Sequence, residues 1–194
     1  MTYITLKRIL DFILSLTGLI VLSPVFLILM ICIKLDSPGP VFFTQKRVGL
    51  HKKHFQILKF RTMRIDTPKN CPTHMLQNPA QYITRTGRFL RKTSLDELPQ
   101  ILNILKGEMS VIGPRPALWN QYDLTEERDK YRANDILPGL TGWAQINGRD
   151  ELPIEKKAKL DGDYVRRMSL TFDIQIFFQT ITSVLRHKGV KEGA

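Results

Sequence analysis

The sequence predicts an α+β protein, with a long apolar helix at the N-terminus and a small body of mixed helices and strands after it. Apolar residues dominate the first 36 of the 194 positions. Two short β-type segments follow, and helical periodicity of apolar residues returns later in the chain. We therefore divide the chain into a membrane segment, residues 1–36, and one further domain, residues 37–194. A chain of this length buries one core of ordinary domain size.

The charge is strongly basic. Lys and Arg number 29 against 18 Asp and Glu, which gives a formal net charge of +11. Such a balance indicates anionic partners, and nucleic acid, anionic lipid and phosphorylated substrates all satisfy it. The basic residues are scattered through the whole chain, and no known DNA- or RNA-binding motif is present. We therefore expect membrane lipids and phosphorylated substrates as partners, and no nucleic acid.

The first apolar segment runs from Ile9 to Ile33. It exceeds the roughly 20 residues that a helix needs to cross a bilayer. A cleaved signal peptide has a shorter apolar core, of about 7–15 residues, and ends in small residues. This segment instead runs into Lys34, and Lys7 and Arg8 precede it. Because basic residues favour the cytoplasmic side, both ends of the segment are expected on that side.

Ser23-Pro24 lies near the middle of the segment. Proline removes one helical hydrogen bond and frees the carbonyl of Ile20, four residues earlier, and a serine hydroxyl can satisfy such a group in hydrocarbon. A helix broken at Ser23-Pro24 that returns to its own face explains both the proline and the flanking charges. A single-pass helix is the alternative. In the re-entrant arrangement Asp11 lies at the level of the lipid headgroups.

The remaining elements are predicted from period and turn residues. Two strands joined by a loop form a hairpin, a polar and proline-rich stretch forms a mobile loop, and Gly107 caps the next helix. The last helix is amphipathic, as interfacial helices are. In chain order the segments are strands 41–43 and 55–60 around loop 49–53, mobile loop 66–81, helix 95–106, irregular segment 113–116, solvated helix 124–131, loop 138–142 and helix 172–185.

Ser94-Leu95-Asp96-Glu97 is the strongest candidate for chemistry, and two interpretations are open. Serine followed three residues later by glutamate, before an apolar periodic run, is a capping box, in which the carboxylates only complement the helix dipole. A helix N-terminus also attracts phosphate, so a carboxylate there can act as a nucleophile toward a phosphoryl group. Three cations just upstream, Arg88, Arg91 and Lys92, add positive charge.

Two further groups can face phosphate. Arg115 stands between prolines, which gives its guanidinium a stiff mount suited to a phosphate, although a rigid surface turn is the alternative. Lys59 and Arg61 fall on one face of a predicted strand, where a phosphate-facing pair and a solvated edge strand are both open. Trp143, in a glycine-rich loop, either stacks on a base or sugar or fills the core.

An acidic pair, Asp161 and Asp163, has the spacing of the metal-binding carboxylates of many glycosyltransferases. The intervening Gly162 favours a turn instead. The histidines and cysteines show no zinc-like spacing, and no nucleotide-binding glycine motif is present.

Several ordered motifs together resemble the small monotopic phosphoglycosyl transferases, the bacterial sugar transferase family that begins glycoconjugate assembly. The resemblance covers nearly the whole chain. The motifs are Lys7-Arg8 with Asp11, Ser23-Pro24, Phe42-Phe43-Thr44-Gln45, Lys59-Phe60-Arg61-Thr62-Met63, Ser94-Leu95-Asp96-Glu97-Leu98-Pro99-Gln100, Gly113-Pro114-Arg115-Pro116, Pro138-Gly139-Leu140-Thr141-Gly142-Trp143 and Asn147-Gly148-Arg149.

The resemblance implies a reaction and roles for residues. Asp96 is then a nucleophile that attacks the β-phosphate of a UDP-sugar, so that UMP leaves and a sugar phosphate remains on the enzyme. Polyprenyl (undecaprenyl) phosphate takes up that group in a second step. Magnesium binds close to Asp96, and Glu97 completes the acidic dyad. Phosphate or nucleotide contacts are implied for Arg115, Lys59, Arg88 and Arg149.

The resemblance also implies a location, the cytoplasmic face of the bacterial cytoplasmic (inner) membrane. Two rival functions make different predictions. A glycosyltransferase using Asp161 and Asp163 releases UDP instead of UMP, and a membrane-anchored anion-binding or nucleic-acid-binding protein releases no nucleotide. The donor sugar, the glycoconjugate pathway, the polyprenyl length and the oligomeric state are not determined by the sequence.

Overall fold

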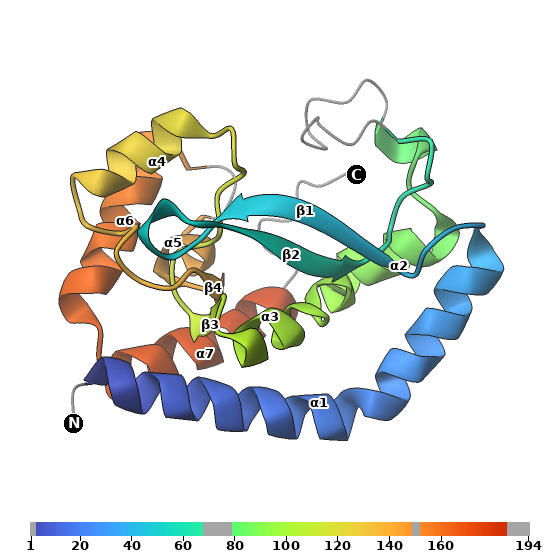
Figure 1. Cartoon of the computed structure of the whole chain (residues 1–194), viewed down its shortest axis with the longest axis horizontal. Helices are drawn as coiled ribbons and strands as arrows, with labels where there is room; N and C mark the ends of the chain where they lie inside the picture. The colour runs from blue at the N-terminus through green and yellow to red at the C-terminus, as the bar shows by residue number, and fades with distance from the viewer. Residues whose placement is uncertain (1–2, 68–78, 149–151, 186–194) are drawn as a thin grey trace.

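The computed structural model describes residues 3–67, 79–148 and 152–185, in which helices and two small sheets lie against one long N-terminal helix (Figure 1). Each sheet has two strands, and the mixture of helix and strand agrees with the predicted α+β class. The strands are β1 (Phe42–Val48), β2 (His54–Phe60), β3 (Ser110–Ile112) and β4 (Gly139–Thr141). The helices are α1 (Tyr3–Asp36), α2 (Arg85–Thr93), α3 (Gln100–Lys106), α4 (Tyr122–Asp129), α5 (Trp143–Ile146), α6 (Ile154–Arg167) and α7 (Leu170–Leu185).

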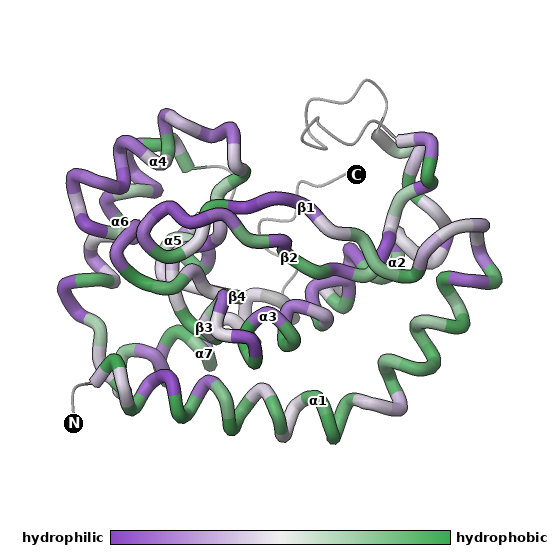
Figure 2. Tube along the Cα trace, in the orientation of Figure 1, coloured by the Kyte–Doolittle hydropathy of each residue, from purple (hydrophilic) through white to green (hydrophobic). Residues whose placement is uncertain are grey.

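Helix α1 is long and apolar enough to cross a membrane. Its 34 residues extend about 50 Å at 1.5 Å per residue. Only 17% of its most apolar 18-residue window is buried, so α1 is not the core helix of a water-soluble domain. Apolar residues colour most of its length in Figure 2, which is compatible with a membrane anchor.

The middle of α1 contains the predicted proline. Helix α1 continues through Pro24, and Figure 1 shows that it changes direction along its length. The Ser23 hydroxyl donates to the carbonyl of Ile20 at 2.7 Å, as expected for the carbonyl that the proline frees. A proline inside a helix is the commonest cause of such a bend.

Both ends of α1 are bound to the rest of the protein. Near its start, Lys7 forms an ion pair of 2.5 Å with Asp173 of α7. At its end, the carboxylate of Asp36 accepts the backbone N–H of Thr86 in α2 at 2.8 Å. The second half of α1 also supplies Phe26, Leu29 and Ile33 to a core cluster with Phe60 and Leu90. The helix therefore packs against one face of the body with both of its halves.

The predicted hairpin is confirmed, with longer strands than expected. Strands β1 and β2 pair antiparallel from Phe42–Phe60 to Val48–His54. Asn103 of α3 binds the edge of β2, where its Oδ1 accepts the N–H of Leu58 at 2.9 Å and its Nδ2 donates to the carbonyl of Gln56 at 2.8 Å. Helix α3 is thereby attached to the strand that carries Lys59.

The predicted loop 138–142 instead contains a strand, β4, which pairs parallel with β3. Its glycines are required by close backbone contacts. A Cβ at Gly139 would lie 2.1 Å from the nitrogen of Gly113, and a Cβ at Gly142 would lie 2.0 Å from the oxygen of Gly113. The turn-type composition therefore reflects packing against the segment before Arg115, a tertiary contact that a local pattern does not encode.

Loop 66–81 lies largely outside the described residues.

The C-terminal helix is confirmed as amphipathic and begins at Leu170, two residues earlier than predicted. Its buried side includes Phe172 and Ile176. Its exposed apolar side is formed by Leu170, Ile174, Phe177, Phe178 and Ile181.

The acidic pair at Asp161 and Asp163 lies in α6, not in a turn. Asp161 is buried and receives two hydrogen bonds from the guanidinium of Arg128, at 2.6 and 2.8 Å. Asp163 forms a separate, exposed ion pair with Arg166. Residues two apart on a helix point in different directions, so the two carboxylates do not form a metal site. Arg128 also shows that α4 is not fully solvated, because it is buried on that helix.

We expect the substitution Asp161→Asn to destabilise the protein by about 3–5 kcal/mol, because it leaves the charge of Arg128 buried without a counter-ion. Burial raises the pKa of Asp161, although the charge of Arg128 acts in the opposite direction. The pair is therefore costly to break but not strongly stabilising in itself. The measurement is thermal unfolding of the purified protein, with the double variant Arg128→Met/Asp161→Leu as control. Stability of the double variant far below that of Asp161→Asn would contradict this explanation.

Candidate active site

Asp96 lies in a short 3₁₀ turn (Leu95–Glu97) between α2 and α3, and the predicted capping box is not formed. Ser94 has a left-handed backbone, with φ of 57°, and ends α2 instead of starting the next helix. Pro99 separates the turn from α3, which begins at Gln100. The predicted helix 95–106 is therefore two elements, although Gly107 does cap the second one as expected. Asp96 does not lie at the N-terminus of an α-helix, so any positive charge beside it comes from side chains.

Lys59 is the first of these cations. It lies near the end of β2, and its Nζ is 2.9 Å from Oε1 of Glu97 and 4.0 Å from Oδ2 of Asp96. All three side chains are largely buried. Lys59 therefore lies beside both members of the acidic pair, and its phosphate contact stays a prediction.

Arg115 is the second cation. Its guanidinium spans the carboxylate of Glu97, with Nη2 2.7 Å from Oε1 and Nη1 3.4 Å from Oε2. The loop that carries it is held from several sides. The backbone N–H of Gly113 donates to the carbonyl of Thr141 at 2.8 Å, and the guanidinium of Arg47 donates to the carbonyl of Pro116 at 3.0 Å. The rigid mount expected for Arg115 is thus present, and it is directed at the acidic pair and not at a surface turn.

Glu97 is ionised in this setting. Burial works to raise the pKa of Glu97, but the positive charges of Arg115 and Lys59 outweigh it and hold that pKa well below its usual range. Glu97 consequently acts as the common counter-ion of two cations that reach it from different parts of the chain.

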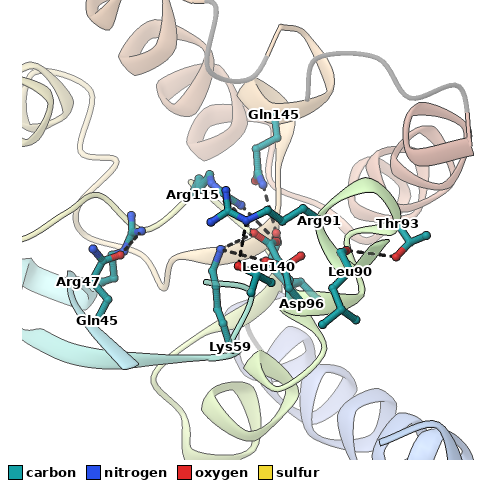
Figure 3. A network of polar contacts seen from close by, with 12 residues as sticks. Gln45, Arg47, Lys59, Leu90, Arg91, Thr93, Asp96, Arg115, Leu140 and Gln145 are labelled. Carbon is teal, nitrogen blue, oxygen red and sulfur yellow. Dashed lines mark hydrogen bonds and ion pairs between the residues drawn. The ribbon is translucent and has the colours of Figure 1, made fainter. Parts of the chain in front are cut away.

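Arg91 is the third cation, and it belongs to the group of basic residues just upstream of Asp96 in the sequence. Figure 3 shows its side chain with those of Lys59 and Arg115 gathered on one side of Asp96. The hydroxyl of Thr62 accepts a hydrogen bond from its Nε at 2.9 Å, which fixes the direction of the guanidinium. Three cations therefore surround two carboxylates, and the cluster carries a net positive charge suited to a diphosphate.

The sequence offered no basis for choosing Arg91 over its neighbours, because only the rotation of α2 decides which cation faces inward. Arg88, one turn earlier, is exposed on α2, and within the described part of the chain it makes no contact with the acidic pair. Its predicted phosphate contact stays a prediction. Arg149 lies outside the described residues.

The predicted pairing of Lys59 with Arg61 is wrong. Strand β2 ends at Phe60, and Arg61 is buried, where it donates to the carbonyl of Ser37 at 2.8 Å and to that of Pro38. Arg61 thus caps the end of α1 instead of facing a substrate. Neither residue belongs to a solvated edge strand, since both are largely buried.

The structure also shows where two residues of segment 138–147, Trp143 and Gln145, lie relative to the site. Trp143 packs on Phe172, with ring centroids 5.1 Å apart, so the core interpretation of this tryptophan is the right one. Gln145 is buried near the cationic cluster, and its amide donates to the carbonyl of Leu140 at 3.2 Å (Figure 3). Sequence reasoning did not select Gln145, and a lone glutamine carries no signal that would have done so.

The described residues fit a magnesium ion that shares its ligands with a substrate. Nowhere in ranges 3–67, 79–148 and 152–185 do three His, Cys, Asp or Glu side chains form a cluster able to hold a metal. Magnesium in phosphate-handling sites commonly uses one or two carboxylates, several waters and substrate phosphate oxygens. Asp96 would supply such an oxygen ligand, and a magnesium ion close to it stays a prediction.

Comparison with known proteins adds an independent observation. The family model described as "Bacterial sugar transferase" matches residues 2–187. The chain belongs to the bacterial sugar transferase family. This match covers helix α1 and the acidic pair alike, so the resemblance based on separate motifs is confirmed over nearly the whole length.

Three relatives of this sugar transferase illustrate how similar it is to known proteins and how much of each protein it covers. It is 41% identical to the uncharacterized sugar transferase EpsL of Bacillus subtilis, over 96% of the chain and 91% of that protein. It is 43% identical to the UDP-glucose:undecaprenyl-phosphate glucose-1-phosphate transferase of Escherichia coli, over 91% of the chain but 39% of that protein. It is 36% identical to the UDP-N-acetylgalactosamine-undecaprenyl-phosphate N-acetylgalactosaminephosphotransferase of Aeromonas hydrophila, over 97% of the chain and 46% of that protein.

The names of these relatives test the prediction that this chain is an enzyme of the phosphoglycosyl transferase class. Those with a full name are sugar-phosphate transferases, so the prediction that this chain is a phosphoglycosyl transferase enzyme is confirmed at the level of the family. The chain spans less than half of these two longer relatives. Their names also differ in the sugar, and for that reason family membership does not identify the donor.

Proposed function

We propose that this sugar transferase moves a sugar 1-phosphate from a UDP-sugar to polyprenyl (undecaprenyl) phosphate, with release of UMP. The observation that carries the proposal is a buried carboxylate, Asp96, beside a cluster of cations that hold the neighbouring Glu97. A carboxylate can attack a phosphorus atom only where the negative charge of the phosphate is screened. Lys59, Arg91 and Arg115 offer that screening on one side of Asp96 (Figure 3).

The reaction has two balanced steps. In the first, an oxygen of Asp96 forms a bond to the β-phosphorus of the donor, and the bond from that phosphorus to the oxygen bridging both phosphates breaks, so that UMP leaves. In the second, an oxygen of the lipid phosphate forms a bond to the same phosphorus. The aspartyl oxygen leaves, and Asp96 is regenerated as a carboxylate. The two half-reactions use one site in turn, which is a ping-pong mechanism.

The cationic side chains have separate parts in these steps. Arg115 is a rigid two-pronged donor of the kind that binds phosphate oxygens. Lys59 lies close to both Glu97 and Asp96, where its positive charge would screen the approach of the anionic donor to Asp96. Magnesium held by Asp96 would add charge neutralisation of the donor diphosphate.

The attachment of both ends of α1 supports a re-entrant membrane helix. A straight helix of this length would separate Lys7 from Asp36 by more than the roughly 30 Å thickness of the hydrocarbon core. Both residues are bound to one body, through Asp173 and Thr86, so a bent helix that enters and leaves on the same face satisfies these contacts. Basic residues at both ends favour the cytoplasmic face of the inner membrane. The exposed apolar side of α7 would lie in the same interface.

The substitution Pro24→Ala tests this topology. Restoring the missing helical hydrogen bond should straighten α1, so that the two ends of the chain are reported on opposite sides of the membrane. The measurement is the accessibility of tags at both termini in intact cells and in inverted vesicles. Val21→Ala, on the exposed surface of the same helix, is the matched control. Unchanged accessibility of both tags in the Pro24 variant would mean that the proline does not set the topology.

Incubation of the purified protein with magnesium and UDP-sugars labelled in the sugar tests the reaction itself. We expect label on the protein and free UMP before any lipid acceptor is added, and transfer of the label to polyprenyl phosphate afterwards. Release of UDP would favour a glycosyltransferase. No nucleotide release from any donor, even with lipid acceptor present, would favour a binding protein without chemistry.

A further inference from the structure

The first turns of α1 carry polar side chains that the membrane does not require. Asp11, which a re-entrant helix would place at the level of the lipid headgroups, is buried against the rest of the protein, at 3% exposure. Its Oδ1 accepts the backbone N–H of Val111 in β3 at 3.0 Å. A carboxylate in an apolar helix is costly unless it has such a partner. Its partner lies only four residues before Arg115.

Neighbouring residues of α1 reach the same region. Arg8 donates to the last carbonyls of α3, that of Ile104 at 2.7 Å and that of Leu105 at 3.3 Å. Lys7 and Tyr3 both bind Oδ2 of Asp173, at 2.5 and 2.6 Å. Four hydrogen bonds from three residues therefore join the start of α1 to α3 and α7, both of which lie next to β3.

Asp173 continues the network toward β3. Its second oxygen accepts the hydroxyl of Tyr164 at 2.8 Å, and that hydroxyl lies 3.3 Å from the carbonyl of Ile112. Burial raises the pKa of the Tyr164 hydroxyl, with the negative charge of Asp173 acting in the same direction, so it stays a hydrogen-bond donor. The short strand β3 is thus held through Val111 by one α1 residue and at Ile112 by a tyrosine that α1 anchors.

We propose that Asp11 is a positioning residue for Arg115, through which the membrane helix sets the geometry of the active site. Strand β3 has three residues and leads directly into the loop of Arg115. Rigid, short connections transmit a displacement of β3 to the guanidinium, and a misplacement of about 1 Å at a catalytic site can cost about 100-fold in rate. This inference rests on the proposed function for its catalytic part only.

A double-mutant cycle tests the catalytic part, with kcat/KM for UMP release as the measurement. Asp11→Leu keeps the side-chain size but removes the acceptor, and should lower kcat/KM by about 10- to 100-fold. Asp11→Asn keeps an acceptor oxygen and should recover most of that loss. If Asp11 acts through Arg115, combining Asp11→Leu with Arg115→Ala should cost little more than Arg115→Ala alone. Independent effects would multiply.

Ser15 provides the matched control for the cycle. It lies one turn after Asp11 on the same buried side of α1, and its hydroxyl has no hydrogen-bond partner in the described structure. Ser15→Ala should therefore leave kcat/KM close to the wild-type value, which shows that a change on this side of α1 is not by itself enough to lower the rate. Multiplying effects of the Asp11 and Arg115 variants would overturn the proposal.

Hydrogen exchange supplies a second measurement that does not depend on turnover. In the full-length protein, Asp11→Leu should lower the protection of the amides in 110–115 by about tenfold or more, and Asp11→Asn should not. Tyr164→Phe, which removes the other contact with β3, should act in the same direction if the leucine variant does not fold. Unchanged protection in both variants would overturn the positioning role. Wild-type protein that releases no UMP would instead overturn the proposed function, while the exchange result still decides the role of Asp11.

Discussion

The substitution Asp96→Asn is expected to lower turnover by about 10⁴-fold or more, and to abolish labelling of the protein by a sugar-labelled donor. The amide has nearly the same shape as the carboxylate, but it carries no charge and cannot form the covalent phosphoryl bond. Because Lys59 lies 4.0 Å from this carboxylate and 2.9 Å from Glu97, the cationic cluster should stay in place around the amide. Donor binding should therefore survive while both half-reactions stop. The measurements are UMP release and protein-bound label, with donor affinity measured separately.

Asp163→Asn is the control for this prediction. Asp163 is an exposed carboxylate on α6, paired with Arg166 and remote from Asp96 in the sequence. Its removal should change turnover by less than about twofold, because surface substitutions of this kind alter stability by about 0.5 kcal/mol or less. Substantial UMP release by Asp96→Asn would remove Asp96 from the role of nucleophile, and loss of activity in Asp163→Asn would show that the effect is not specific to Asp96.

The substitution Arg115→Ala is expected to lower kcat/KM by about 10²- to 10³-fold, the cost of losing one preorganised donor to a developing charge. Two consequences combine in this variant. The phosphate loses a rigid two-pronged contact, and Glu97 keeps only Lys59 as a counter-ion. Arg115→Lys should have an intermediate effect, because it restores the charge but not the planar fork. Arg166→Ala, an exposed arginine, is the control.

The pH dependence of this variant gives an independent reading. In the wild-type protein Arg115 and Lys59 hold the pKa of Glu97 well below its usual range, so Glu97 stays ionised in mildly acidic solution. Without Arg115 that pKa should rise. Protonation of Glu97 would then release Lys59 at a higher pH, and the acid limb of the kcat/KM profile should move upward. An acid limb at the wild-type position would show that the ionisation of Glu97 does not limit activity.

Much of the fold followed from local patterns. The apolar length of α1, the proline at its middle and the hydrogen bond of Ser23 to Ile20 all follow from residues that are neighbours in the chain. The hairpin and the amphipathic last helix follow for the same reason, because strand and helix periods are properties of short windows. The resemblance implied that Asp96, Glu97 and Arg115 serve one reaction, and in the structure Arg115 forms an ion pair with Glu97.

Where prediction from the sequence failed, the deciding partner was distant. Arg61 matches a strand residue, yet it binds carbonyls 24 and 28 positions earlier, at Ser37 and Ile33. Asp161 matches half of a metal site, yet it lies against Arg128. In each case the residue matches the local pattern, but a partner far along the chain determines its actual contacts.

The sequence by itself therefore determined the family, the long apolar helix with proline at its middle, and the two side chains, Asp96 and Arg115, for which we propose roles in the reaction. Only the tertiary structure decided which cations face Asp96. It also decided that Glu97 is the common counter-ion of Lys59 and Arg115, and that Asp11 binds the strand before Arg115. The physical reason is that helix and strand propensities act over a few residues, whereas the direction of a buried charge is set by whichever partner relieves its desolvation, however far along the chain that partner lies.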